Sequence, residues 1–405
     1  MGTIRNNILS LHPRRQHNFE QAAALAELFP GKFTHATSIY LAPWLVKLLK
    51  KVSPGRSGWL ARRSYAGLPN KYVISLPGVE VKKLWWAWRR KGINYFNLND
   101  AWQRAVLKRF SPPAICISYD GSSNLIFREW KNKAKLILDL SIGLPQYRIK
   151  MLHGEKFKIE MLESADEFQK KLFNQYQEEV ELADLILCGS EFVKDTITFF
   201  YPEFAPKCRI LPYAADTDKF DFPDRQFSDS KDLKFVFIGT VGWRKGADLL
   251  LEVWREFVAN HPECELHFFG PVDKEICLTS LPDRVSVHGS VESRKLIEYL
   301  KVMDVFVLPT TFEGSSLAVY QAMAMQLPII TTRNSGSVLS HGESCELVEV
   351  SDKNSLLAGL TKIFNNMEYR QYIAKNAYAL SRMYTWSEYK KRIFKILEQE
   401  GLTNL

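Results

Sequence analysis

The sequence predicts an α/β protein built from two doubly wound domains, each a parallel sheet covered by helices. Three observations predict this fold. The chain has 405 residues, which exceeds what one hydrophobic core usually supports. Short aliphatic runs alternate with helical patterns, the sequence form of parallel strands joined by crossover helices. The alternation forms two sets, which meet in a polar stretch at residues 212–227.

The first set predicts an N-terminal domain over residues 1–212. A helical pattern covers residues 19–28, and a long polar helix is expected from about residue 155 to 183. Ser190 follows a strand and is the expected N-cap of the next helix. The expected strands are the aliphatic runs at residues 7–11, 114–118, 135–140, 184–188 and 209–212.

The second set predicts a C-terminal domain over residues 213–385. Helices are expected up to about residue 260, through residue 300 and over residues 317–325. A last helix at residues 386–405 is expected to pack back toward the N-terminal domain. The expected strands are FVFIG at residues 235–239, ELHFFG at 265–270, VSVHG at 285–289, DVFVLP at 304–309 and PIITT at 328–332.

The formal charge of +9 is unevenly distributed along the chain. Residues 1–110 contain 19 Lys plus Arg and 4 Asp plus Glu, a net charge of +15, so the remaining residues carry −6. This asymmetry indicates an acidic partner for the N-terminal third: anionic lipid, nucleic acid or an acidic substrate. Residues 41–63 and 81–91 interleave Trp and Leu with Lys and Arg, the composition of an interfacial helix. A partly buried helix with a solvated cationic face explains the same pattern equally well.

The location is predicted from the same composition. No apolar run reaches the ~18 residues that a bilayer span needs, and the first 15 residues lack the apolar centre of a signal peptide. We expect a cytoplasmic protein with peripheral contact at the inner face of the cell membrane through its basic third. The basic residues stand outside any nucleic-acid-binding motif, so no nucleic-acid partner is expected. Six cysteines without a C-x-x-C pair predict buried thiols.

Two loops carry the chemistry, because ligands of open α/β sheets bind beyond the carboxyl ends of the strands. The first, GTVGWRKG at residues 239–246, offers glycines, a helix start, Arg244 and Lys245 for a phosphate. Many proteins that bind no phosphate share this arrangement, and the G-x-G-x-x-G spacing is absent. The second, TTFEGSS, places Glu313 before the exposed N–H groups of residues 315–318, with Gln321 further along the helix. An ordinary capped helix with a polar face is the alternative.

These residues resemble the family-4 retaining glycosyltransferases of GT-B architecture, within the glycosyl transferases group 1. The likeness covers most of residues 184–390. The resemblance implies two Rossmann-like domains that face each other across a cleft, the first for the acceptor and the second for a nucleotide-sugar donor. It implies sugar transfer with retention to a glycan or lipid-linked acceptor, in cell-surface polysaccharide synthesis. The matching motifs are DLILCGSEFVKD, LPYAADTDKF, FIGTVGWRKGADLLL, ELHFFG, VHGSV, DVFVLPTTFEGSSLAVYQAMAMQLPIITTRNSG and YTWSEY.

The resemblance also implies roles for single residues. The family's E-x7-E element gives one carboxylate to the donor sugar and another to the ribose, and a Lys-Gly pair supports the diphosphate. Glu313 would then contact the sugar, Lys245 the phosphates, and both are catalytic candidates. The other donor-binding candidates are Gly239, Thr240, Arg244, Gly270, His288, Gly289, Gly314, Ser315, Ser316, Leu317 and Gln321. Of these, Ser315, Ser316 and Leu317 would offer backbone N–H groups to the diphosphate, and Gly270, His288 and Gly289 would border the base.

Two residues depart from the family pattern. Gln321 replaces the second glutamate of E-x7-E, and Thr240 stands where an arginine is expected, which leaves Arg244 as its substitute. A glutamine holds a ribose diol less firmly than a carboxylate does. We therefore expect a dTDP-linked donor such as dTDP-rhamnose rather than a UDP-sugar or a GDP-linked donor such as GDP-mannose.

The N-terminal domain resembles the family in arrangement only. The family's Gly-Gly loop and middle-strand histidine are replaced by LHPRRQHNFEQ and LILDLSIGLP. Isolated polar residues at such places are more often caps or buried hydrogen-bonding groups. The candidates that could face the sugar are His12, His17, Asn18, Asp120, Asp139 and Ser141, and Asp139 is the catalytic candidate among them.

No metal or resident cofactor is expected beyond the nucleotide sugar, which is a co-substrate. Asp216 and Asp218 form a D-x-D pattern, but it lies in the linker motif that the family shares without metal. Two alternatives stay open, because function belongs to sites rather than to scaffolds. One is a GT-B scaffold without catalysis that binds membrane or nucleic acid. The other is a sugar phosphorylase or sugar-phosphate synthase.

Overall fold

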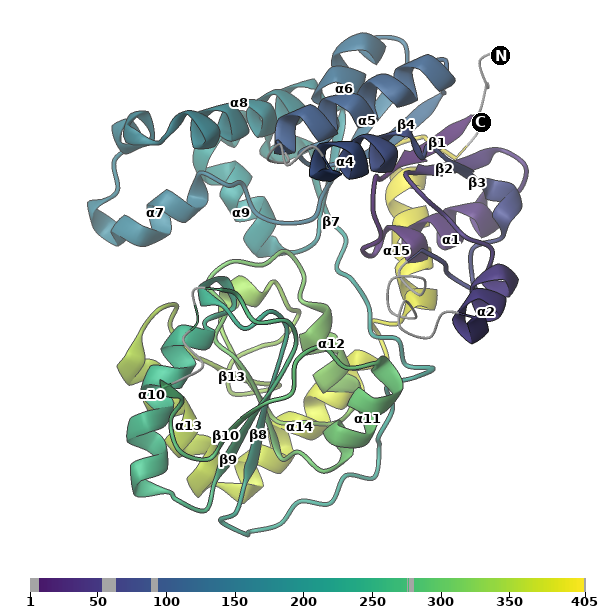
Figure 1. The fold of residues 1–405 in the computed structure, drawn as a ribbon. Helices are drawn as coiled ribbons and strands as arrows, with labels where there is room; N and C mark the ends of the chain where they lie inside the picture. Colours follow the sequence, from purple (N-terminus) through teal and green to yellow (C-terminus); the bar gives the residue numbers. More distant parts are fainter. Residues whose placement is uncertain (1–6, 53–62, 89–93, 275, 277–279, 404–405) are drawn as a thin grey trace. The chain divides into compact units, whose positions relative to one another are not determined.

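The computed structural model describes residues 7–52, 63–88, 94–274, 276 and 280–403 (Figure 1). The chain divides into two compact units. Unit 1 comprises Met1–Cys188, Lys194–Leu211 and Lys390–Leu405, and unit 2 comprises Gly189–Val193 and Pro212–Tyr389. The main division after Leu211 lies next to the boundary expected at residue 212.

Unit 1 contains a seven-stranded parallel sheet in the order β3-β2-β1-β4-β5-β6-β7. The strands are rich in Ile, Leu and Val and are buried on both faces in the centre of the sheet, as parallel strands require. The direction of winding reverses between β1 and β4. The bounds are β1 Ile8–Leu11, β2 Phe33–Thr37, β3 Val73–Ser75, β4 Ile115–Tyr119, β5 Lys135–Leu140, β6 Leu185–Cys188 and β7 Cys208–Ile210.

Unit 2 contains a six-stranded parallel sheet in the order β10-β9-β8-β11-β12-β13. Here the winding reverses between β8 and β11. The bounds are β8 Lys234–Ile238, β9 Glu265–Phe269, β10 Val285–Val287, β11 Val305–Leu308, β12 Ile329–Thr331 and β13 Glu346–Leu347. The two sheets confirm the predicted pair of doubly wound, Rossmann-like domains, whereas their facing across a cleft stays a prediction.

Helices cover the sheets (Figure 1). The helices of unit 1 are α1 Asn18–Leu28, α2 Pro43–Val52, α4 Gly78–Trp88, α5 Tyr95–Arg109, α6 Asn124–Trp130, α7 Tyr147–His153 and α8 Glu167–Leu182. The helices of unit 2 are α10 Ala247–Asn260, α11 Ser293–Lys301, α12 Leu317–Ala324, α13 Lys353–Asn365 and α14 Met367–Ser381. Two helices have residues in both units, α9 Glu191–Phe200 and α15 Trp386–Gln399.

The long helix expected from about residue 155 is wrong in its first part. Residues 154–164 form two short 3₁₀ segments, and α8 begins only at Glu167. Asp166 sets this start, because its carboxylate accepts a hydrogen bond from the N–H of Gln169 at 2.7 Å. The Gln169 side chain in turn accepts one from the N–H of Asp166 at 3.2 Å, which completes a capping box.

The end of the chain belongs to unit 1 from Lys390 onward. Lys390 forms an ion pair with Glu27 of α1 at 2.5 Å, and Arg209 forms one with Glu400 at 2.5 Å. Ile393 and Leu397 of α15 are fully buried. The last helix therefore contributes to the core of unit 1.

Among the described residues, no helix combines the length and the apolar character that crossing a bilayer requires. The five described cysteines are buried free thiols, as expected from their spacing. Cys277 lies outside the described residues.

Candidate active site

The candidate donor residues lie at the switch point of the sheet of unit 2. Parallel strands end at the same edge of a sheet, and a crevice forms where the winding reverses. In unit 2 the loops after β8 and β11 meet at this point. The β8 loop carries Arg244 and Lys245, and the β11 loop carries Glu313.

These three side chains form one charge cluster. Glu313 accepts hydrogen bonds from Lys245, with Nζ and Oε1 separated by 3.0 Å, and from Arg244. The side chains of Glu313 and Lys245 are each 13% exposed, and that of Arg244 is 36% exposed. Burial lowers the pKa of Lys245 from its usual value, and the negative charge of Glu313 opposes this shift. The cluster thus places the two cations of the β8 loop next to the partly buried carboxylate of the β11 loop.

Hydrogen bonds from side chains to backbone carbonyls fix the two loops against each other. The carbonyl oxygen of Arg244 accepts hydrogen bonds from the hydroxyls of Thr310 and Thr311, at 3.0 and 2.9 Å. The Arg244 guanidinium also donates to the carbonyl of Phe312 at 3.0 Å. Asn334 joins the loop from β12 by donating to the carbonyl of Thr311 at 2.8 Å. The charge cluster therefore rests on three strand-end loops rather than on flexible side chains alone.

Gly239 lets the Lys245 side chain cross the end of β8. Its φ is +141°, which side-chain-bearing residues rarely adopt. A Cβ atom at this position would lie 2.6 Å from Cδ of Lys245. Thr240 is half-buried beside it and Gly246 ends the loop with a φ of +72°, where the helix α10 begins.

The start of α12 provides the expected N–H groups only in part. Ser316 donates its N–H to the carbonyl of Ser335 at 3.0 Å, so this group is already engaged. The N–H groups of Ser315 and Leu317 meet no protein acceptor among the described residues. The carbonyl of Gly314 accepts a hydrogen bond from the hydroxyl of Ser190. Ser190 also accepts one from the N–H of Val193 at 3.3 Å, which makes it the N-cap of α9 that the sequence predicts.

Gln321 lies in the fifth position of α12 and is half-buried. Its neighbours Tyr320 and Ala322 are fully buried, so the helix holds Gln321 at the margin of the core. Gln321 thus lies one turn inside α12, whereas Glu313 lies in the loop before this helix.

The positions expected to border the base lie after β9 and β10. The N–H of Gly270 donates to the carbonyl of Gly289 at 2.8 Å. The ring of His288 stacks on Phe269 with centroids 4.4 Å apart and an interplanar angle of 6°. Its Nε2 lies 3.1 Å from Nδ1 of His267. Burial, followed by His267, lowers the pKa of His288, which favours the neutral ring.

A second polar cluster lies at the switch point of unit 1, after β1 and β4. The ring of His12 packs on Tyr119 with centroids 4.0 Å apart. Nδ1 of His12 accepts a hydrogen bond from the N–H of Arg14 at 3.0 Å, while Nε2 is buried without a partner among the described residues. Burial lowers the pKa of His12 well below its usual value.

Asp139, the catalytic candidate of unit 1, is only 6% exposed at the end of β5. Its Oδ2 lies 2.8 Å from Nε2 of His17 and 3.1 Å from the amide nitrogen of Gln21. Asn18 contacts His35 instead, at 3.3 Å. The carboxylate of Asp139 is therefore held by side chains at the start of α1.

Asp120 lies beside this cluster and is likewise engaged. It accepts hydrogen bonds from the N–H of Ser141 and the hydroxyl of Tyr176, both at 2.8 Å. Burial raises the pKa of Asp120 to about 6. Ser141 also donates its hydroxyl to Tyr119 at 3.1 Å.

Sequence reasoning missed several residues of both clusters. Thr310, Thr311 and Asn334 hold the loops around Glu313 together, and their only signal is that they lie in the loops that follow β11 and β12. Gln21 and Tyr119 surround Asp139 and His12, but nothing in their local sequence distinguishes them from ordinary core residues.

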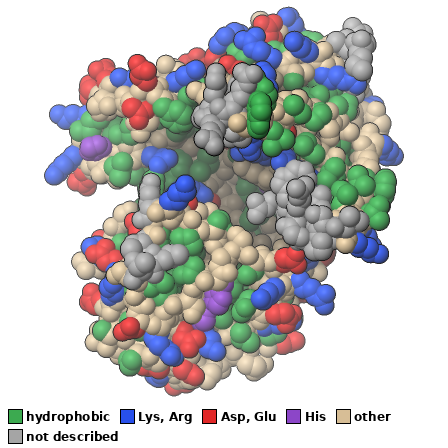
Figure 2. Space-filling view, in the orientation of Figure 1, with side chains coloured by type: hydrophobic (Ala, Val, Ile, Leu, Met, Phe, Trp, Pro, Cys, Tyr) green, Lys and Arg blue, Asp and Glu red, His purple; other side chains and the backbone are tan. Residues whose placement is uncertain are grey.

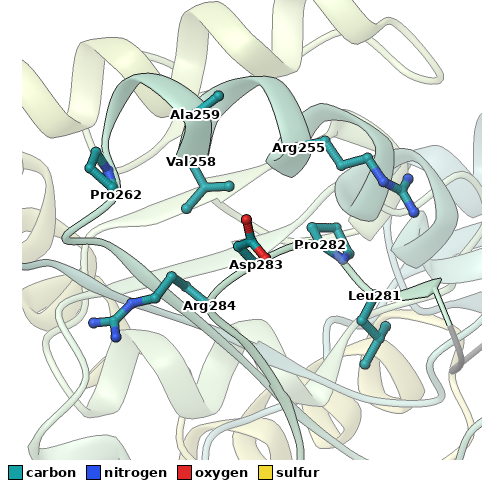
Figure 3. A pocket seen from close by; sticks show the side chains of 8 residues that line it. All are labelled: Arg255, Val258, Ala259, Pro262, Leu281, Pro282, Asp283 and Arg284. Carbon is teal, nitrogen blue, oxygen red and sulfur yellow. The ribbon is translucent and has the colours of Figure 1, made fainter.

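A hollow of about 710 Å³ in unit 2 lies elsewhere (Figure 3). Its residues include Pro262, which precedes β9, and Pro282, which precedes β10. They therefore line the amino ends of strands whose carboxyl ends carry the candidate site. Arg255 and Arg284 at this hollow also bond to Ser280 and Glu265. We do not assign the donor to it.

Within the described ranges, no three His, Cys, Asp or Glu side chains gather in a way that could hold a metal ion. Asp216 of the D-x-D pattern forms an ion pair with Lys219 in a turn. That no ion is required stays a prediction.

Comparison with known proteins finds a family match in the C-terminal part. Residues 218–380 match the family model described as Glycosyl transferases group 1. An uncharacterized glycosyltransferase of Haemophilus influenzae is 27% identical over 153 residues, which cover 36% of this chain and 43% of that protein. The chain spans about half the length of the curated relatives it matches, from 43% to 60% for three of them.

Solved structures match nearly the whole chain. Sucrose-phosphate synthase from Thermosynechococcus elongatus has a TM-score of 0.67 at 15% identity, covering 98% of this chain and 99% of that one. HepE from Anabaena in complex with UDP and glucose has a TM-score of 0.58 at 12% identity, covering 97% and 99%. These likenesses show that the fold is GT-B.

Proposed function

We propose that this protein, whose residues 218–380 match the family model Glycosyl transferases group 1, is a retaining glycosyltransferase. It transfers a sugar from a nucleotide-diphosphate donor to a glycan or lipid-linked acceptor in cell-surface polysaccharide synthesis. The observation that carries the proposal is the cluster of Glu313, Arg244 and Lys245 at the switch point of unit 2. It joins cations for a diphosphate to a carboxylate for sugar hydroxyls.

Lys245 and the start of α12 supply the chemistry of bond cleavage. The diphosphate leaving group accumulates negative charge as the anomeric bond breaks. Lys245, Arg244 and the N–H groups of Ser315 and Leu317 stabilise this charge, because they are fixed in place before reaction. The acceptor then attacks from the face that the diphosphate leaves, so no enzyme nucleophile is required.

Glu313 acts on the sugar and on the cations. In the unliganded cluster its carboxylate engages both Lys245 and Arg244. A donor diphosphate competes for these cations, which frees acceptor positions on Glu313 for sugar hydroxyls. Charge-assisted hydrogen bonds of this kind are about twice as strong as neutral ones.

The nucleotide is less well defined than the reaction. The HepE structure holds UDP, which supports a nucleoside diphosphate as the ligand of this fold. Gln321 supports a donor whose nucleoside has a deoxyribose without a 2′-hydroxyl. This favours a dTDP-linked sugar over UDP- or GDP-linked donors. Unit 1 binds the acceptor. Its helices with basic and aromatic side chains support an acceptor that is lipid-linked and lies at the inner face of the membrane.

The test is a screen of UDP-, GDP- and dTDP-linked sugars for release of nucleoside diphosphate, with glycan, lipid-linked and sugar-phosphate acceptors. We expect turnover with at least one donor and a product of retained anomeric configuration, read by NMR. EDTA should leave the rate unchanged. Turnover that consumes inorganic phosphate instead would identify a phosphorylase and contradict the proposal.

Glu313→Gln tests the site within this assay. It keeps the size of the side chain but removes the charge, so we expect turnover to fall by about 100-fold. Glu343→Gln, at an exposed position of unit 2, is the matched control and should leave turnover unchanged. Near-normal turnover by Glu313→Gln, with the same melting temperature as wild type, would refute the assignment.

A further inference from the structure

Two helices of unit 1 expose hydrophobic and basic side chains together. Among the described residues fifteen large hydrophobic side chains are exposed, and six of them belong to α2 and α4. They are Trp44, Leu48, Val81, Leu84, Trp85 and Trp88, which are between 44% and 77% exposed. Scattered exposed apolar residues are ordinary, but such a concentration on two helices marks an interaction site.

On α2 these side chains share one face with lysines. Trp44, Lys47, Leu48 and Lys51 are exposed and are spaced three or four residues apart, which places them on one side of the helix. Val46 on the other side is 7% exposed and packs into unit 1. The outward face therefore combines two apolar and two cationic side chains.

On α4 the exposed face is more apolar. Val81, Leu84, Trp85 and Trp88 follow the same helical spacing, with exposed Lys82 beside them. Val79 is buried on the side that faces the unit. Two aromatic rings and two aliphatic side chains thus point outward from one helix of 11 residues.

Both helices start from the same corner of the sheet. α2 follows the carboxyl end of β2, and α4 follows that of its neighbour β3. The N–H of Leu76 donates to the carbonyl of Thr37 at 2.8 Å, which ties the two strand ends together. Figure 2 shows hydrophobic side chains over both helices on one face of unit 1, with basic side chains near them.

The charge around these helices has one sign. Residues 41–91 contain twelve Lys or Arg and a single acidic residue, Glu80. Glu80 forms an ion pair with Arg63 at 3.4 Å, and both side chains are mostly buried. The described residues of α2 and α4 therefore offer no other carboxylate to a partner. Residues 53–62 and 89–91 of the basic segments lie outside the described residues.

We propose that α2 and α4 form a docking surface by which the protein binds an anionic lipid membrane. Trp rings and aliphatic side chains enter the interfacial layer, while lysines beside them contact lipid phosphates. The combination of apolar and cationic residues on one helical face favours this occupant. A nucleic acid would match the charge but would leave the aliphatic side chains in water. In a dimer formed through this surface, the lysines of one copy would face those of the other.

The experiment is co-sedimentation of the full chain with vesicles of phosphatidylcholine, alone or mixed with phosphatidylglycerol. We expect binding to the anionic vesicles at low salt, weak binding to the neutral ones, and loss of binding as salt rises. Lys47→Gln with Lys82→Gln should lower the partition coefficient by about fivefold for each lysine removed. Trp44→Ser with Leu48→Ser, and separately Leu84→Ser with Trp88→Ser, should each lower it by about tenfold or more.

Matched variants on other surfaces serve as controls. Val302→Ser with Tyr372→Ser removes exposed hydrophobic side chains of unit 2, and Lys375→Gln with Lys395→Gln removes two exposed lysines. These should bind vesicles like wild type, and thermal melts verify that every variant is folded. The readout uses no nucleotide sugar, so it is independent of the proposed transferase activity.

Three results would overturn the proposal. The first is no binding to anionic vesicles at low salt. The second is equal binding by the α2 and α4 variants and by wild type. The third is a different occupant of this surface, seen as a salt-resistant dimer or as RNA binding that displaces vesicles. Either would count against the membrane if the variants at Trp44 and Trp88 abolish it.

Discussion

At the scale of single residues, Glu313 is the centre of the donor site because it pairs with two cations at once. Lys245 is nearly buried, and an isolated ammonium at this position would be costly. The carboxylate offsets that cost and holds Lys245 and Arg244 where a diphosphate can reach them. A neutral residue at 313 would therefore disturb both the sugar contact and the position of the cations.

Gln321 is the residue on which the nucleotide preference depends. Its amide offers one acceptor, whereas a glutamate accepts bidentate, charge-assisted hydrogen bonds from both ribose hydroxyls. We therefore expect wild type to bind dTDP at least as tightly as UDP or GDP in calorimetric titrations. Gln321→Glu should shift the ratio of affinities toward UDP or GDP by about tenfold. A wild-type preference for a ribonucleotide, left unchanged by Gln321→Glu, would contradict this account.

At the scale of elements, the end of β8 is shaped to let Lys245 reach the site. Gly239→Ala places a Cβ atom 2.6 Å from Cδ of that side chain, which must then move. We expect nucleoside diphosphate affinity to fall by about tenfold or more, while the free energy of unfolding falls by only about 1–3 kcal/mol from backbone strain. Calorimetry and urea denaturation measure the two effects.

Gly31→Ala is the control for backbone strain. Gly31 has a φ of +76° and no atom within 4 Å of an added Cβ. It should lose similar stability and keep normal nucleotide affinity. Equal affinity of both variants for the nucleotide would show that Lys245 does not bind it.

Unit 1 buries His35 in β2 and His12 just after β1, and this makes its stability depend on pH. Burial lowers the pKa of His35 from 6.5 to about 3, and that of His12 falls well below 6.5. The unfolded chain binds protons at these sites below pH 6.5 and the folded chain does not, so stability is lost as pH falls from 6.5. Each histidine contributes a slope of about 1.4 kcal/mol per pH unit over that range.

His35→Gln tests this dependence. Its side chain can still hydrogen-bond with Ser10 and Asn18, which contact His35 at 3.2 and 3.3 Å. In urea denaturation between about pH 6 and pH 4, the slope of stability against pH should fall by about 1.4 kcal/mol per unit. His153→Gln, at an exposed position of α7, is the control. An unchanged slope in His35→Gln would refute the role of burial.

At the scale of the whole molecule, periodicity predicted most of the strands and the presence of two sheets, but it missed β2, whose five residues include the polar Thr34, His35 and Thr37. β5 occupies Lys135–Leu140, the run that its aliphatic pattern indicates. β3 and β13 were also missed; they have only three and two residues and are fixed by pairing with β2 and β12. The start of α8 depends on the Asp166 capping box, which outweighs the helical pattern before it.

The site was predictable where it lies on a motif and not where it depends on distant pairing. Lys245 and Glu313 lie in loops between a strand and a helix that the sequence predicts, and Gln321 lies in the predicted helix that follows Glu313. Asp139 and His17 are 122 residues apart in the chain, and only the fold brings α1 against the end of β5. The sequence therefore names Asp139 as a candidate but does not identify His17 and Gln21 as the residues that hydrogen-bond with it.

The most direct test of the account is the binding of nucleoside diphosphates to wild type and to Lys245→Ala, measured by calorimetry against Lys375→Ala as the control. If the switch point of unit 2 holds the diphosphate, wild type and Lys375→Ala bind UDP, GDP or dTDP alike. Lys245→Ala then loses about 10-fold to 100-fold in affinity while it stays folded. Binding that is undiminished in Lys245→Ala would contradict the account, because the diphosphate would then lie elsewhere.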